Sequence, residues 1–100
     1  MTEIDVRCEV IIDGRQCHVR VSDEGGTSEY DVSIGTLGSF LPSILPYPGF
    51  DDMERLVRET FVFLLEREPR TAILPRFDLS DVSRYFSEYP AVIRVRLSRT

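Results

Sequence analysis

Two cysteines and the only histidine of this 100-residue chain lie close together near its N-terminus, at Cys8, Cys17 and His18. Residues of these types can form a disulfide, ligate a metal ion, or supply a nucleophile and its general base. Each of these roles needs side chains on the same side of the backbone, so the local structure decides what the three residues can do.

The chain around these residues has the alternation of a half-buried β-hairpin. Apolar side chains recur at every second position from Ile4 to Ile12 and again from Cys17 to Val21. Asp13-Gly14, between the two runs, is typical of a two-residue type I′ turn, whose central residues need positive φ angles. A turn at these two residues pairs Ile12 with Arg15 and places the apolar side chains of both runs on one face.

This register argues against chemistry at the cysteines and the histidine. Cys8 lies opposite Val19 and diagonal to Cys17, so the sulfur atoms are poorly placed for a disulfide and two buried free thiols are expected. His18 lies on the other face, opposite Glu9, so a metal site with the cysteines is excluded and a cross-strand pair is favoured over a general base.

Two groups of carboxylates resemble metal-binding clusters. One group is Asp51, Asp52 and Glu54, and the other is Asp78 and Asp81. Both are expected in the first turn of a helix, where carboxylates cap free N–H groups and interact favourably with the helix dipole. The sequence contains no phosphate-binding glycine loop and no zinc-ligand spacing. It therefore predicts no catalytic residue, no metal site and no cofactor, and it does not indicate an enzyme.

The composition is that of one soluble globular domain spanning residues 1–100, with 42% hydrophobic and 29% charged residues. No apolar run is long enough to span a membrane, and the first residues lack the features of a signal peptide, so the cytoplasm is expected. The net charge of −5 argues against a nucleic-acid partner, which selects for a basic face. The oligomeric state is left open.

Beyond the hairpin, the pattern predicts an α+β fold, with an antiparallel sheet packed by one main helix and one short helix. Residues 30–34 alternate and predict a third strand, and residues 92–97 alternate again and predict a possible C-terminal strand. The main helix is expected at about 51–67, because Pro69 prevents its continuation. The short helix is expected at about 78–87, with Asp78 as its N-cap.

The main helix carries a wide apolar surface. At 100° per residue, its large apolar side chains span an arc of about 200°, which is more than contact with one sheet requires. The helix is therefore expected to pack on the sheet and also against the C-terminal segment.

Residues 35–50 contain no charged side chain and several large apolar ones. One hypothesis is that they form a connector whose side chains enter the core. The other is that they form an exposed surface for a partner. The candidate interaction surface in that case consists of Phe40, Leu41, Ile44, Tyr47 and Phe50.

The second half of the chain has a distinctive spacing. The run Leu56-Val-Arg-Glu-Thr-Phe-Val-Phe-Leu-Leu-Glu-Arg-Glu-Pro69 is followed by Ile73-Leu74, Phe77-Asp-Leu79 and Tyr85-Phe86. This spacing resembles that of a group of small uncharacterised bacterial proteins with the pattern LVxxSFxFLLEREPxxxILxxFDLxxIxxYFPEY. The resemblance implies a bacterial source and a compact fold, and it implies no activity, cofactor or binding residue.

Three functional hypotheses follow from the sequence. The preferred one is a non-catalytic protein–protein interaction module or accessory protein of a bacterial cell. The second is a small ligand-binding protein or enzyme with a pocket between residues 35–50 and the main helix, using Tyr47, Arg55 or Arg58. The third is an acidic inhibitor that mimics nucleic acid.

Overall fold

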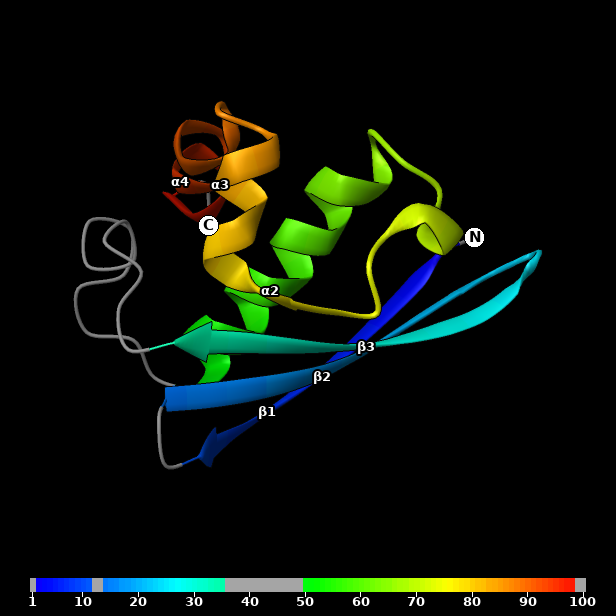
Figure 1. Ribbon diagram of the computed structural model, residues 1–100, viewed down its shortest axis with the longest axis horizontal. Helices are drawn as coiled ribbons and strands as arrows, with labels where there is room; N and C mark the ends of the chain where they lie inside the picture. The colour runs from blue at the N-terminus through cyan, green and yellow to red at the C-terminus, as the bar shows by residue number, and fades with distance from the viewer. Residues whose placement is uncertain (1, 12–13, 36–49, 99–100) are drawn as a thin grey trace.

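Four strands form one sheet in the computed structural model, which describes residues 2–11, 14–35 and 50–98, and the helices lie on one face of that sheet (Figure 1). The strand order is β1-β2-β3-β4. The strands are β1 (Glu3–Ile11), β2 (Gly14–Asp23), β3 (Gly26–Gly35) and β4 (Arg76–Asp78). The first three pair antiparallel and β4 pairs parallel to β3. The expected α+β class is confirmed, with a mixed sheet instead of a purely antiparallel one.

The register of the first hairpin differs by two residues from the predicted one. Ile11 pairs with Gly14 and Cys8 pairs with Cys17, which differs from the pairing that a turn at Asp13-Gly14 would give. A shift of two residues keeps each side chain on its face, because side chains alternate with a period of two. The alternation therefore fits either register, and the predicted apolar face is still the buried one. Its fully buried members are Val6, Cys17, Val19 and Val21.

The observed register brings the two cysteines directly opposite each other, and they form a disulfide. Their Cα atoms are 4.0 Å apart, and Cys17 is fully buried while Cys8 packs against the core. The prediction of two free thiols is wrong, because it followed from a register in which the cysteines were diagonal.

The disulfide is expected to stabilise the fold. It joins residues nine positions apart, and restricting an unfolded loop of that length contributes about 2–3 kcal/mol to the free energy of unfolding. Urea denaturation with and without dithiothreitol measures this difference. Alkylation of the purified, unfolded protein without reductant tests whether the disulfide is present. Uptake of two alkyl groups would show that it is absent.

The main helix, α2 (Phe50–Leu65), lies across the sheet. The wide apolar surface expected from the sequence is buried. Phe61 is fully buried, and its ring centroid lies 5.0 Å from that of Tyr30 and 5.9 Å from that of Phe77. The other buried side chains of α2 are Met53, Leu56, Val57, Thr60, Phe63 and Leu64. The predicted cap at Asp51 lies outside the described side chains.

The C-terminal segment is a helix, α4 (Tyr89–Ser98), and the predicted strand at 92–97 is wrong. Tyr89, Ile93 and Leu97 are buried at a spacing of four, so the segment follows the helical period. Pro90 lies in the first turn, where its missing N–H costs nothing. The predicted packing of the main helix on this segment is confirmed, because the buried Thr60 and Tyr89 hydroxyls lie 2.7 Å apart.

The chain between α2 and α4 contains only short elements: η1 (Arg70–Ala72), β4, η2 (Leu79–Asp81) and α3 (Val82–Tyr85). The predicted helix at 78–87 is therefore divided into η2 and α3. Its predicted start is confirmed, since Asp78 accepts a hydrogen bond from the Ser80 N–H at 3.0 Å and Asp81 accepts one from the Asp78 N–H at 3.1 Å. In the described part of the chain, no helix has the length and apolarity needed to cross a membrane.

Phe61→Ala is expected to lower the free energy of unfolding by about 3–5 kcal/mol, the range for a buried Phe. The side chain is fully buried against Tyr30 of β3 and Phe77 of β4, so its loss leaves a cavity in the core. Reversible urea denaturation measures the change, and a loss below about 1 kcal/mol would contradict this position in the core.

Candidate functional site

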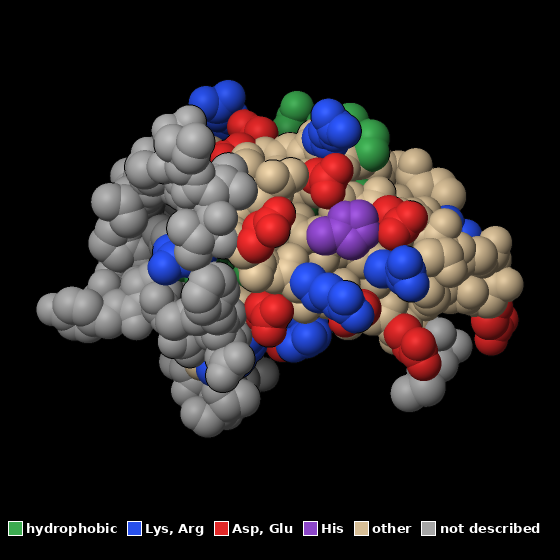
Figure 2. Space-filling model, turned by 90° about the horizontal axis from the view of Figure 1, so that it is seen from below, with side chains coloured by type: hydrophobic (Ala, Val, Ile, Leu, Met, Phe, Trp, Pro, Cys, Tyr) green, Lys and Arg blue, Asp and Glu red, His purple; other side chains and the backbone are tan. Residues whose placement is uncertain are grey.

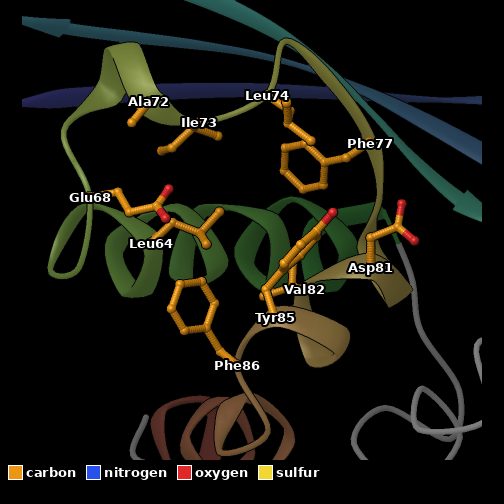
Figure 3. Close-up of a pocket in the computed structure, with 10 residues that line it drawn as sticks. All are labelled: Leu64, Glu68, Ala72, Ile73, Leu74, Phe77, Asp81, Val82, Tyr85 and Phe86. Carbon is orange, nitrogen blue, oxygen red and sulfur yellow. The ribbon is translucent and has the colours of Figure 1, made fainter.

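Three large hydrophobic side chains of the described residues are strongly exposed: Leu74 (56%), Tyr85 (72%) and Val95 (52%). Leu74 and Tyr85 line the same concave surface, a pocket of about 260 Å³. Figure 3 shows the two side chains converging on this space from the segment before β4 and from α3. We refer to this space as the apolar pocket. Val95 lies on α4 and does not line it.

The path of the chain after α2 explains why the pocket exists. The chain turns at Pro69, passes through η1 to the edge of the sheet, and pairs β4 with β3. The Ser33 hydroxyl of β3 donates to the Asp78 carboxylate of β4 at 2.8 Å, and this hydrogen bond holds β4 at the sheet edge. The chain then returns to the helix layer through η2 and α3. Because α3 has only four residues, this return covers the C-terminal half of α2 incompletely.

The walls of the pocket are fixed by the core. Its deepest side chains are those of Leu64, Ile73 and Val82, which are all buried. The Phe86 ring packs edge-on against the buried Phe63 ring at 5.6 Å, and Phe77 packs on Phe61 as described above. Side chains held in this way cannot easily collapse into the space, because protein interiors are closely packed. The pocket is therefore preformed.

Two carboxylates and one hydroxyl are the polar side-chain groups of the described lining: Glu68, Asp81 and Tyr85. Asp81 is already engaged, because it caps η2 and lies 3.6 Å from Arg84. Glu68 has no ion-pair partner among the described residues. Figure 3 shows its carboxylate directed over Leu64, toward the interior of the pocket.

This arrangement is suited to binding an apolar group. The described lining contains no His, Cys, Lys, Ser or Thr that could act as a nucleophile or as a general base near neutral pH. Across the described residues, no group of three or more His, Cys, Asp and Glu side chains could hold a metal ion. The pocket can take an apolar group and place a negative charge beside it.

No helix of the described residues covers the opposite face of the sheet, which has a charged surface with His18 near its centre (Figure 2). His18 Nδ1 lies 3.1 Å from an Asp31 oxygen and Nε2 lies 3.0 Å from a Glu29 oxygen. Both ring nitrogens can donate only when the imidazole is protonated. The predicted partner, Glu9, instead pairs with Gln16, because the register differs by two residues.

The charged sheet face predicts a pH dependence of stability. The hydrogen bonds to Glu29 and then to Asp31 raise the pKa of His18 above 6.5, and the hydrogen bond from His18 lowers the pKa of Glu29 below 4.5. The raised pKa of His18 stabilises the fold below about pH 6.5, and this contribution is lost as pH rises through the folded pKa. The lowered pKa of Glu29 stabilises the fold above about pH 4.5, and this contribution is lost as pH falls through its folded pKa.

The stability difference between the wild type and His18→Gln is therefore expected to be largest between these two pKa values and to vanish in alkaline solution. It is expected to be small, because the His18 side chain is half exposed. Urea denaturation at a series of pH values measures it. A difference that stays constant from pH 5 to pH 9 would contradict the assignment of a protonated His18.

The described lining of the pocket includes none of the candidate residues chosen from the sequence. Phe40, Leu41, Ile44 and Tyr47 lie outside the described residues, as does the side chain of Phe50. Arg55 donates to the Leu97 carbonyl at 2.6 Å, which joins α2 to the end of α4. Arg58 is exposed on α2. The alternative site based on Tyr47, Arg55 or Arg58 is therefore not assembled by the described residues.

Sequence reasoning did not select Leu74 and Tyr85. The sequence did contain a sign of an exposed apolar surface, because the stretch from Ile73 to Phe86 has more large apolar side chains than its short elements can bury. Locating the excess on one surface required the position of β4, which the sequence pattern did not predict.

Comparisons with known protein families, with curated protein sequences and with solved structures find no match to this chain.

Proposed function

We propose that this protein is a non-catalytic interaction module that holds an apolar side chain of a partner protein in the apolar pocket. The proposal depends on one observation: Leu74 and Tyr85, two of the three strongly exposed large hydrophobic side chains of the described residues, border a concave surface with a buried floor. Exposed apolar side chains that gather around a pocket mark an interaction site, whereas scattered ones do not.

The size of the pocket favours a side chain as its occupant. Its volume of about 260 Å³ is below the range of roughly 300–1,000 Å³ for pockets that enclose drug-sized ligands. A single Leu, Met or Phe side chain suits this space, with neighbouring residues of the partner lying across Leu74 and Tyr85. Apolar anchors in preformed pockets commonly supply much of the affinity of protein interfaces.

A small apolar ligand is the second candidate, since the same concavity would enclose it. The pocket that would hold it lies between α2, β4 and α3, whereas the pocket predicted between α2 and residues 35–50 falls outside the described residues. The third hypothesis, an acidic mimic of nucleic acid, gains no support from the open sheet face, where acidic side chains are interspersed with Arg and His (Figure 2).

The cellular setting also belongs to the proposal. A bacterial source is implied by the resemblance noted above, and the sequence favours the cytoplasm. Cytoplasmic reductants would keep Cys8 and Cys17 as thiols, whereas an oxidising compartment preserves the disulfide. Alkylation of the protein during lysis of the source cells distinguishes the two compartments.

Leu74→Glu is expected to abolish co-purification of the partner from the source organism, because a charge on the rim would have to be desolvated on binding. Val95→Glu is the matched control: Val95 is exposed to a similar extent, 52% against 56% for Leu74, but does not line the pocket. Both variants are expected to keep a melting temperature close to that of the wild type. Equal loss of the partner in both, or retention in both, would contradict the proposal.

A further inference from the structure

We propose that the apolar group bound in the pocket belongs to a basic segment of the partner, whose Lys or Arg pairs with Glu68. This inference depends on the proposed function, because it specifies the chemistry of the partner at the same pocket. It begins from the charged groups of the lining: the described lining contains two carboxylates, those of Glu68 and Asp81, and no Lys, Arg or His.

Glu68 is the acid available for a partner. Its side chain is partly buried at the end of the pocket, and no cation of the described residues pairs with it. The neighbouring acids differ in this respect. Glu66 pairs with Arg96 and Asp81 lies beside Arg84, so their charges are already compensated within the fold.

The end of α2 adds to the negative potential at this position. Glu68 lies three residues beyond Leu65, the last residue of α2, and its N–H donates to the Leu64 carbonyl at 2.8 Å. The C-terminal end of a helix carries a partial negative charge, which favours a cation. The last turn of α2 itself contains no basic residue, although Arg67, two residues beyond it, donates to the Phe63 carbonyl at 3.0 Å.

Arg67, which precedes Glu68 in the sequence, pairs with other groups. Arg67 lies over the Phe63 ring, with the guanidinium carbon 3.6 Å from the ring centroid. It donates to the Phe63 carbonyl and to Glu88. The Arg67 guanidinium is therefore held over the Phe63 ring. Arg67 is not part of the described pocket lining.

The combination of an apolar floor and one uncompensated carboxylate selects the ligand. Leu64, Ile73 and Val82 bind the apolar side chain, and Glu68 binds a Lys or Arg next to it in the partner sequence. A partner segment that carries a carboxylate or a phosphate at this position would be repelled by Glu68 and by the end of α2. The pocket is thus expected to discriminate by the charge adjacent to the anchor.

Three acetylated hexapeptide amides test this inference, each with one central Phe followed by Arg, Ser or Glu and with Gly and Ser elsewhere. Binding to the full chain is measured at low salt from the amide shifts of Leu64, Ile73 and Val82 in ¹⁵N–¹H spectra. The Arg peptide is expected to bind about threefold tighter than the Ser peptide, since an exposed ion pair changes an equilibrium constant by about 1.4- to 5-fold. The Glu peptide is expected to bind most weakly. The difference is expected to shrink in 0.5 M salt, where the screening length is about 4 Å.

Glu68→Gln is expected to remove the difference between the Arg and Ser peptides and to leave the Ser peptide nearly unaffected. Glu9→Gln is the matched control, because it makes the same change of charge at an exposed residue of β1 outside the pocket, and it is expected to keep the difference. Equal binding of the three peptides to the wild type, or an Arg preference that survives in Glu68→Gln, would overturn the inference and leave the proposed function standing. Failure of all three to shift these amides would overturn the proposed function itself, and the inference with it.

Discussion

The rest of the structure depends on the need to cover the wide apolar surface of α2. The sheet covers only part of this surface, through contacts such as that of Phe61 with Tyr30. Leaving the remainder in water would forfeit about 25 cal/mol for each Å² of apolar area. The second half of the chain therefore has to pack around α2, and its path is determined by the two flanks of the helix that the sheet does not reach.

The two flanks are covered to different extents. On one flank, α4 packs closely along α2. The buried Tyr89 hydroxyl donates to the Thr60 hydroxyl, which donates to the Leu56 carbonyl, and Arg55 donates to the Leu97 carbonyl in the last turn of α4. On the other flank, the chain makes a detour to the sheet edge to form β4 and returns with only a four-residue helix. The apolar pocket is the part of this second flank that remains open. Its floor is thus a continuation of the core, which is why it is both apolar and preformed.

The sequence predicted which faces of the strands and of the main helix are buried, but it did not predict how the strands pair. Alternation in β1 and β2 and the arc of α2 predicted the buried side chains, because burial follows from local periodicity. The register of the hairpin could not be predicted in the same way, since a two-residue shift buries the same face, and the disulfide between Cys8 and Cys17 was missed with it. Residues 93 and 97 satisfy both a strand and a helix pattern, so α4 was mistaken for a strand. The pocket was missed because it depends on β4, a three-residue strand with no periodicity of its own.

The central claim is that the surface of α2 between β4 and α3 is open to an apolar group. The most direct measurement is of intermolecular nuclear Overhauser effects between dissolved toluene and the methyl groups of the folded protein. We expect contacts from toluene to the methyl groups of Leu64, Ile73 and Val82, which line the pocket. We expect none to those of Val19 and Val21, which are fully buried in the core on β2. The absence of contacts at the pocket methyl groups, or contacts spread evenly over the core, would contradict this claim.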